Sequence, residues 1–190
     1  MMRRLTFSAS VMAAVLCLPA LATEDWTVGK AVKAVIADAI RPAFSNYEIQ
    51  TMGMSASMDA LCAEPGPVTL AEARAQFTQV ASSWGQAEFM RIGPLANENR
   101  LERTQYWPDR KGRGLRQVRI AIAQEQEPVV AVETLSRQSV AVQGLLALEF
   151  VLFGDESGML ETGAVHRCAY GKAISGNLSN IAAELSAEWS

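Results

Sequence analysis

The sequence predicts an all-α protein, an up-and-down helical bundle of about four to five main helices. Apolar residues recur at helical spacing in several segments, and no segment alternates apolar and polar residues as a strand does. Short polar links that contain proline or glycine separate these segments, as in helical bundles with short connections. A chain of 190 residues can bury one cooperative core, so one domain is expected.

The N-terminus predicts a signal peptide at residues 1–22. Arg3 and Arg4 precede an apolar stretch, and Ala-Leu-Ala at residues 20–22 forms a small-x-small cleavage site. The apolar stretch, residues 5–18, is shorter than the roughly 20 residues that a membrane span needs. We therefore expect a periplasmic protein whose helical domain is residues 23–190, with no transmembrane segment in the mature chain.

Two helices are expected before the first clear break. In residues 26–39, valine, isoleucine and alanine recur on one helical face. Pro42 suits the first turn of a following helix, or a kink, better than a helix interior. A second, methionine-rich helix should then run to Leu61, where Glu-Pro-Gly-Pro at residues 64–67 ends it in a turn.

A third helix is expected from the capping-box spacing of Thr69 and Glu72, and it should end at Gly93. Trp84 and Trp107 are interpreted as core anchors, although tryptophan can also shape a ligand pocket.

The rest of the chain predicts further helices around one loop. Residues 106–112 should form a loop, because Pro108 disfavours helical geometry in the residue before it. A helix should follow this loop, then a polar connection, a buried helix at 139–154 and a last helix from Ala164 to the end.

Two cysteines, Cys62 and Cys168, remain after signal-peptide cleavage. In an oxidising compartment such a pair predicts a disulfide rather than two free thiols. The functional alternative, a metal or redox pair, lacks close spacing and nearby ligands.

Charge and motifs exclude several function classes. The chain has 17 Lys and Arg against 20 Asp and Glu, a net charge of −3, so it is not a general nucleic-acid binder. Its one histidine, His166, excludes a zinc site with several histidines. The sequence also lacks a Gly-x-Ser-x-Gly elbow, an HExxH motif, a phosphate loop and a dinucleotide fingerprint.

The segment 139–154 is the most apolar part of the chain, and it contains one acid, Glu149. A helix without a polar face should be buried on nearly all sides. A buried carboxylate is costly unless it is paired, hydrogen-bonded or metal-bound. We therefore expect Glu149 either to be held by a basic partner or to be poised for chemistry.

This segment resembles the signature helix of the imelysin family of bacterial envelope proteins, the M75 peptidase-like group. The family motif is Gly-x-His-x-x-Glu with an aromatic-apolar-apolar-aromatic-Gly tail, and Gly144, Glu149 and residues 150–154 match it. The resemblance implies that the family's His and Glu, which share a helical face, hold one metal ion together. Here the histidine position is Leu146, which removes half of that site, so only Glu149 could serve as a ligand, for iron or another hard cation.

A second stretch carries the same resemblance. Imelysin-like proteins have an Asn-Arg-x-x-Arg and Trp-Pro-Asp-Arg pattern before the signature helix. The residues here that match or extend this basic stretch, and are therefore candidates for binding, are Asn99, Arg100, Trp107, Asp109, Arg110, Arg113 and Arg116.

Two interpretations of these arginines remain open. In the first, they are solvated or fix loops, and one arginine reaches inward to neutralise Glu149. In the second, they form an anion-binding lip beside Glu149, because arginine binds carboxylate and phosphate in a bidentate manner.

The resemblance covers the first half of a two-bundle family and implies three functional hypotheses. The first is a non-catalytic periplasmic binding or scaffolding protein linked to iron acquisition, whose partner is an envelope protein or a small anionic or metal ligand. The second is an M75-type metallopeptidase, which the missing histidine argues against. The third is a structural bundle, or a truncated fragment of a two-bundle protein.

Overall fold

The computed structural model describes residues 27–190, which contain helices and no strand. The predicted signal peptide, residues 1–22, lies outside the described residues. The main helices are α1 Val28–Val35, α2 Arg41–Ala63, α3 Pro67–Ala87, α4 Arg100–Thr104, α5 Arg113–Ala123, α6 Val132–Leu135, α7 Leu145–Phe153 and α8 Val165–Trp189. A π-helical turn, Ile36–Ile40, joins α1 to α2, and 3-10 segments lie at Gly93–Asn99, Arg110–Gly112, Glu127–Val129, Val140–Val142 and Ser157–Thr162. The prediction of an all-α bundle is confirmed.

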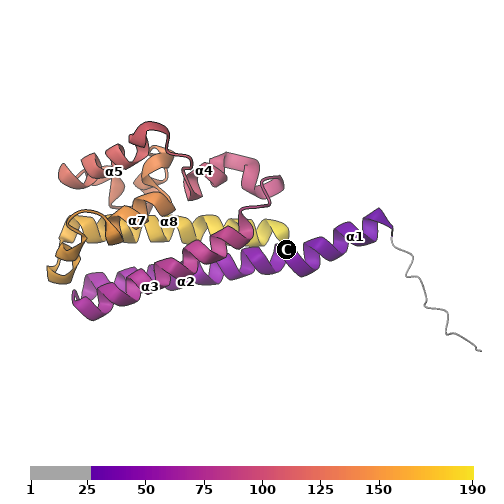
Figure 1. Ribbon diagram of the computed structural model, residues 1–190, viewed down its shortest axis with the longest axis horizontal. Coiled ribbons are helices and arrows are strands. Elements are labelled where there is room, and N and C mark those ends of the chain that lie inside the picture. The colour runs from indigo at the N-terminus through magenta and orange to yellow at the C-terminus, as the bar shows by residue number, and fades with distance from the viewer. Residues whose placement is uncertain (1–26) are drawn as a thin grey trace, which may run out of the picture.

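The long helices α2, α3 and α8 form the frame of the bundle (Figure 1). Helix α2 packs along both α3 and α8, and the short α7 packs against α8 with α3 and α5 beside it. Figure 1 shows α4, α5 and α7 together on one side of the long helices. Within residues 27–190, no helix combines the length and hydropathy that a membrane span requires.

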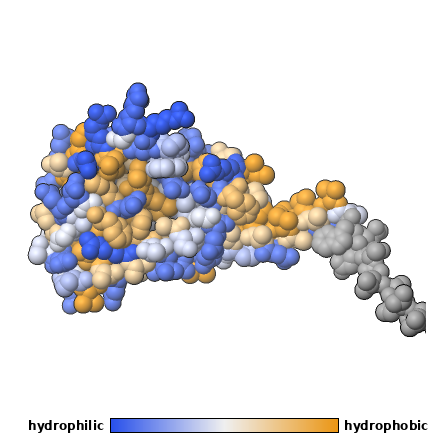
Figure 2. Space-filling view, viewed as in Figure 1, coloured by the Kyte–Doolittle hydropathy of each residue, from blue (hydrophilic) through white to orange (hydrophobic). Residues whose placement is uncertain are grey.

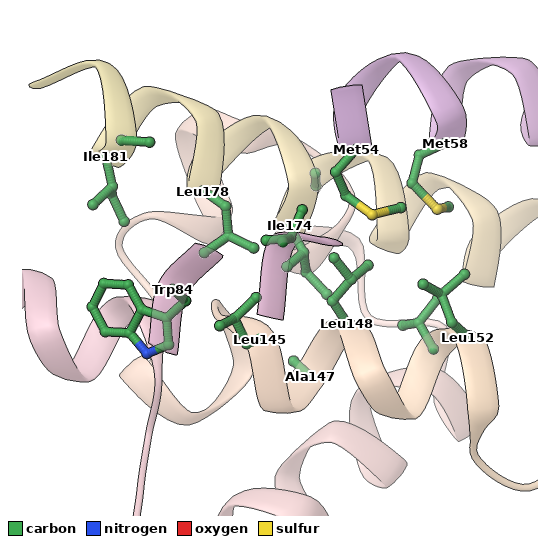
Figure 3. Close-up of a cluster of buried hydrophobic side chains, with 14 of the residues drawn as sticks. Met54, Met58, Trp84, Leu145, Ala147, Leu148, Leu152, Ile174, Leu178 and Ile181 are labelled. Atoms are coloured by element: carbon green, nitrogen blue, oxygen red, sulfur yellow. The ribbon is translucent and has the colours of Figure 1, made fainter. Parts of the chain in front are cut away.

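The core lies where α2, α7 and α8 meet (Figure 3). Met54 and Met58 of α2 are fully buried, and methionine fills irregular gaps between helices well. The other labelled members of this cluster are buried on α3, α7 and α8: Trp84, Leu145, Ala147, Leu148, Leu152, Ile174, Leu178 and Ile181. Trp84 is therefore a core anchor, as predicted.

Helix α3 differs from its predicted bounds. It begins at Pro67 rather than at a cap on Thr69, whose hydroxyl donates to the carbonyls of Glu64 and Gly66. Proline has no backbone N–H, and it is favoured in the first helical turn because an N–H there would have no helical partner. The helix ends at Ala87, before the predicted stop at Gly93.

Helix α1 projects beyond the body of the bundle (Figure 1). Its apolar stripe, Val28, Val32 and Val35, is exposed, and Figure 2 shows the hydrophobic colour along this projecting helix.

A disulfide joins the end of α2 to the start of α8, as predicted. It links Cys62 and Cys168, whose Cα atoms lie 5.7 Å apart and which are 106 residues apart in sequence.

Candidate functional site

Gly144 brings α7 into close contact with the end of α4. It caps the N-terminus of α7, after the 3-10 segment Val140–Val142, so the predicted helix 139–154 is in fact two shorter pieces. A Cβ atom at Gly144 would lie 2.5 Å from the carbonyl oxygen of Arg103 and still closer to that of Thr104. Only glycine permits this approach of two backbones.

Glu149 is exposed, so the predicted burial of this carboxylate is wrong. Within residues 27–190, no side chain forms an ion pair or hydrogen bond with it, and the predicted arginine partner is not there. Helix α7 buries Leu145, Leu148 and Leu152 and turns its other side outward. That outer side carries Glu149 together with exposed Phe153 and half-buried apolar residues.

A pocket of about 320 Å³ lies between α3, the segment after α4, and α7. Leu146 and Glu149 both line it, so the two motif positions share a helical face, as their spacing predicts. Glu149 is the only charged residue among the lining residues, which are Phe77, Ala81, Trp84, Gln105, Tyr106, Trp107, Leu145, Leu146 and Glu149. Figure 2 shows hydrophobic residues gathered on this face of the molecule. We call this cavity the Glu149 pocket.

A second pocket, of about 260 Å³, lies on the other side of Leu146 and Glu149, next to Phe150 and Phe153 of α7. Arginine side chains of the protein lie over the two phenylalanine rings of this pocket. The guanidinium carbon of Arg119 is 5.3 Å from the centroid of the Phe150 ring. That of Arg74 is 5.5 Å from the Phe153 centroid.

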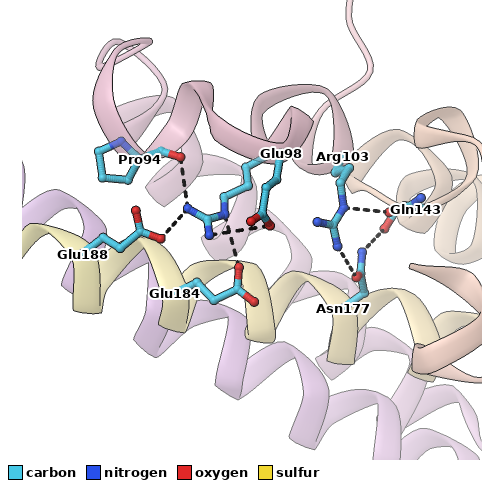
Figure 4. Close-up of polar contacts among 8 residues, drawn as sticks. Pro94, Glu98, Arg103, Gln143, Asn177, Glu184 and Glu188 are labelled. Carbon is cyan, nitrogen blue, oxygen red and sulfur yellow. Dashed lines mark hydrogen bonds and ion pairs between the residues drawn. The ribbon is translucent and has the colours of Figure 1, made fainter. Parts of the chain in front are cut away.

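Arg100 is buried and binds the C-terminal half of α8 instead of approaching Glu149 (Figure 4). Its guanidinium nitrogens lie 2.6 Å from an oxygen of Glu188 and 3.2 Å from one of Glu184. It also donates to the carbonyl of Pro94. A buried cation with these partners anchors α4 and the preceding 3-10 segment to α8.

Arg103 forms a neighbouring polar network (Figure 4). It donates to the side-chain oxygens of Gln143 and Asn177, and Asn177 donates to the carbonyl of Gln143. This network connects α4 and α8 to the residue that precedes Gly144.

Asp109 caps the N-terminus of α5. Its carboxylate accepts from the backbone N–H of Gly114 at 2.9 Å and of Leu115 at 3.0 Å. These N–H donors, that of Gly114 first, lower the pKa of the Asp109 carboxyl below its ordinary value. Asp109 therefore fixes the loop that carries Trp107.

The remaining predicted site residues do not assemble around Glu149. Trp107 lines the Glu149 pocket but is 73% exposed, so its prediction as a core anchor is wrong. The other four are exposed and line neither of the two pockets beside Glu149, so they form no anion-binding lip there: Asn99, Arg110, Arg113 and Arg116.

The donor set does not fit the metal ion that the family motif implies. No group of three His, Cys, Asp or Glu side chains that could hold an ion occurs within residues 27–190. Leu146 offers no ligand atom. His166 lies on α8, where its Nε2 is 3.2 Å from the carbonyl oxygen of Gln126.

Sequence reasoning missed the α3 wall of the pocket. Phe77 and Ala81 lie on the outer side of α3, next to the buried Trp84. Gln105 accepts a hydrogen bond from the indole N–H of Trp84 at 2.5 Å, which joins this wall to the segment after α4. In the sequence, the tryptophans were the only sign of this pocket, because a tryptophan can line a ligand pocket as well as fill a core.

The comparisons with known proteins agree with this fold. No curated protein matches the chain. The solved structure of an imelysin-like protein from Psychrobacter arcticum 273-4 is similar, with a TM-score of 0.73 and 24% sequence identity. The match covers 84% of this chain and 49% of that one, so this chain spans about half its length. The sequence also matches the imelysin family, peptidase M75, over residues 40–190. Since this match includes most of the chain, the protein belongs to the imelysin family.

Proposed function

We propose that this chain is an exported, periplasmic binding protein of the imelysin family without catalytic activity. The observation that supports this most is the composition of the Glu149 pocket. Its walls are aromatic and aliphatic, with one amide and one carboxylate. Apolar walls with few polar groups are typical of sites that bind small ligands.

The same pocket lacks the groups that peptide hydrolysis requires. A metallopeptidase needs a held ion that activates water, and Glu149 is the only carboxylate among the lining residues. A covalent mechanism needs a nucleophile next to a base, and serine, cysteine and histidine are not among the lining residues. The M75 metallopeptidase hypothesis would require ligands from outside this pocket.

The link to iron acquisition comes from the family resemblance. Within that process, we propose a binding or scaffolding role and not the role of an ion carrier. The reason is the donor set, because one carboxylate beside Leu146 cannot hold a metal ion by itself.

Elemental analysis combined with a peptide-cleavage assay tests this function. We expect protein purified without a metal-affinity tag to contain no stoichiometric metal and to cleave no peptide, with or without added divalent ions. The Glu149→Ala variant is the matched control, because Glu149 is the one candidate ligand in the pocket. Stoichiometric metal and cleavage in the wild-type protein, both lost in Glu149→Ala, would show a metallopeptidase instead.

A further inference from the structure

We infer that the Glu149 pocket binds an organic cation, a positively charged nitrogen on a small apolar body. This inference rests on the binding function proposed above and names its ligand class. It depends on the aromatic walls, on the unpaired carboxylate and on a contrast with the second pocket.

The first argument is the number of aromatic walls. Phe77 and Trp84 come from α3, and Tyr106 and Trp107 come from the segment after α4. The face of an aromatic ring carries partial negative charge and attracts cations, and such walls are the usual means of binding alkylammonium groups. Leu145 and Leu146 add apolar surface against which the body of the ligand can pack.

The second argument is the carboxylate. Glu149 is exposed and has no ion-pair partner within residues 27–190. Two other lining side chains carry oxygen, the hydroxyl of Tyr106 and the amide of Gln105, and both are uncharged. The amide oxygen of Gln105 already accepts a hydrogen bond from Trp84. A ligand therefore meets one free negative group, and a positive charge complements it.

The third argument is the contrast with the second pocket. There, the ring of Phe150 has two arginines near it, Arg119 at 5.3 Å and Arg167 at 5.6 Å from the ring centroid. Across the described part of the chain, no arginine or lysine lies over the rings of Trp84, Tyr106 or Trp107 in this way. Trp107, which is 73% exposed and has no cation of residues 27–190 over its ring, therefore remains available to a cation from outside.

The size and charge of the pocket limit the ligand. A volume of about 320 Å³ is near the lower end of small-molecule sites, so the cation is small. No lysine or arginine is among the lining residues, so the one charged group that an anion would meet is the carboxylate of Glu149. The pocket therefore favours cations over the anionic ligand that the sequence suggested.

Calorimetric titration with matched probes tests the inference. Choline supplies a free quaternary ammonium, and 3,3-dimethyl-1-butanol supplies nearly the same shape without charge. Nα-acetyl-lysine amide represents the cationic side chain of a protein partner. We expect at least one of the two cations to bind at least tenfold more tightly than the neutral alcohol. The cation with the higher affinity identifies the source of the ligand.

Variants assign the binding to this pocket. Glu149→Gln and Trp107→Leu should each weaken cation binding at least tenfold, and both should melt like the wild type because these side chains are exposed. Ala81→Phe, which fills the pocket from α3, should abolish binding. Two controls change exposed residues that line neither pocket beside Glu149, and they should bind normally: Ala75→Phe on α3 and Glu133→Gln on α6.

Three results would overturn the inference: equal affinity for the cations and the alcohol, unchanged binding in Glu149→Gln, or no binding of either cation. None of these results contradicts the proposed binding function, because that function is tested separately by metal content and peptide cleavage. The two failures are therefore distinguishable.

Discussion

The Gly144→Ala protein is expected to lose about 3 kcal/mol of its free energy of unfolding, at the upper end of the usual cost of overpacking. The added methyl group would lie 2.5 Å from the carbonyl oxygen of Arg103, with that of Thr104 nearer still. Both partners are backbone atoms of α4, which Arg100 and Arg103 fix to α8. Neither can move aside as a flexible side chain would. Urea unfolding of the two proteins measures the difference.

Gly85→Ala is the matched control. Gly85 lies within α3, and nothing is within 4 Å of an added Cβ atom there. Since alanine is the better helix former, this change should stabilise the protein by about 0.5–1 kcal/mol. A Gly144→Ala protein as stable as the wild type would contradict the close backbone contact between α4 and α7.

Removal of the disulfide is expected to cost about 2–5 kcal/mol, the usual range for a native bridge. The bond between Cys62 and Cys168 closes a long loop, because the two cysteines are 106 positions apart in sequence. In the unfolded chain this cross-link excludes many conformations, which raises the free energy of the unfolded state. Urea unfolding with and without dithiothreitol measures the loss.

The double variant Cys62→Ser/Cys168→Ser is the control for the reductant. It should be as unstable as the reduced wild-type protein and should not respond further to dithiothreitol. Unchanged urea unfolding on reduction, or titratable thiols at both Cys62 and Cys168 in the oxidised protein, would contradict the bridge.

Local sequence patterns predicted the fold because a helical bundle is encoded locally. Helical spacing and proline or glycine at the links are properties of neighbouring residues, so the last helix and the loop around Pro108 were found in the sequence. The prediction of the disulfide followed from the expected oxidising compartment and from the two cysteines expected to remain after signal-peptide cleavage. The start of α3 was predicted wrongly because both Pro67 and Thr69 can begin a helix, and the proline took the first turn.

The environment of Glu149 was not predictable in this way. Helix α7 is apolar all round except at this residue, so its sequence does not tell which side meets the core. The buried side of α7 depends on where α8 packs, and α8 packs on the side that carries Leu145 and Leu148. The exposure of Glu149 is therefore determined by how the helices pack and not by the local sequence.

The partners of the basic stretch were hidden for a similar reason. Arg100 pairs with Glu184 and Glu188, which are more than 80 residues further along the chain. No local pattern connects them. The pocket likewise combines residues of α3, α7 and the segment between α4 and α5, which only the packed bundle brings together.

The accessibility of the Glu149 carboxylate is the claim on which the proposed binding site depends most. Carbodiimide coupling of glycine ethyl ester to carboxylates, followed by mass spectrometry of the peptides, measures it directly. In the free protein Glu149 should react as fast as exposed Glu133, and saturating choline, where the titration shows that it binds, should slow the reaction of Glu149 alone. Protection of Glu149 in the free protein, or an equal rate with and without bound choline, would contradict the account.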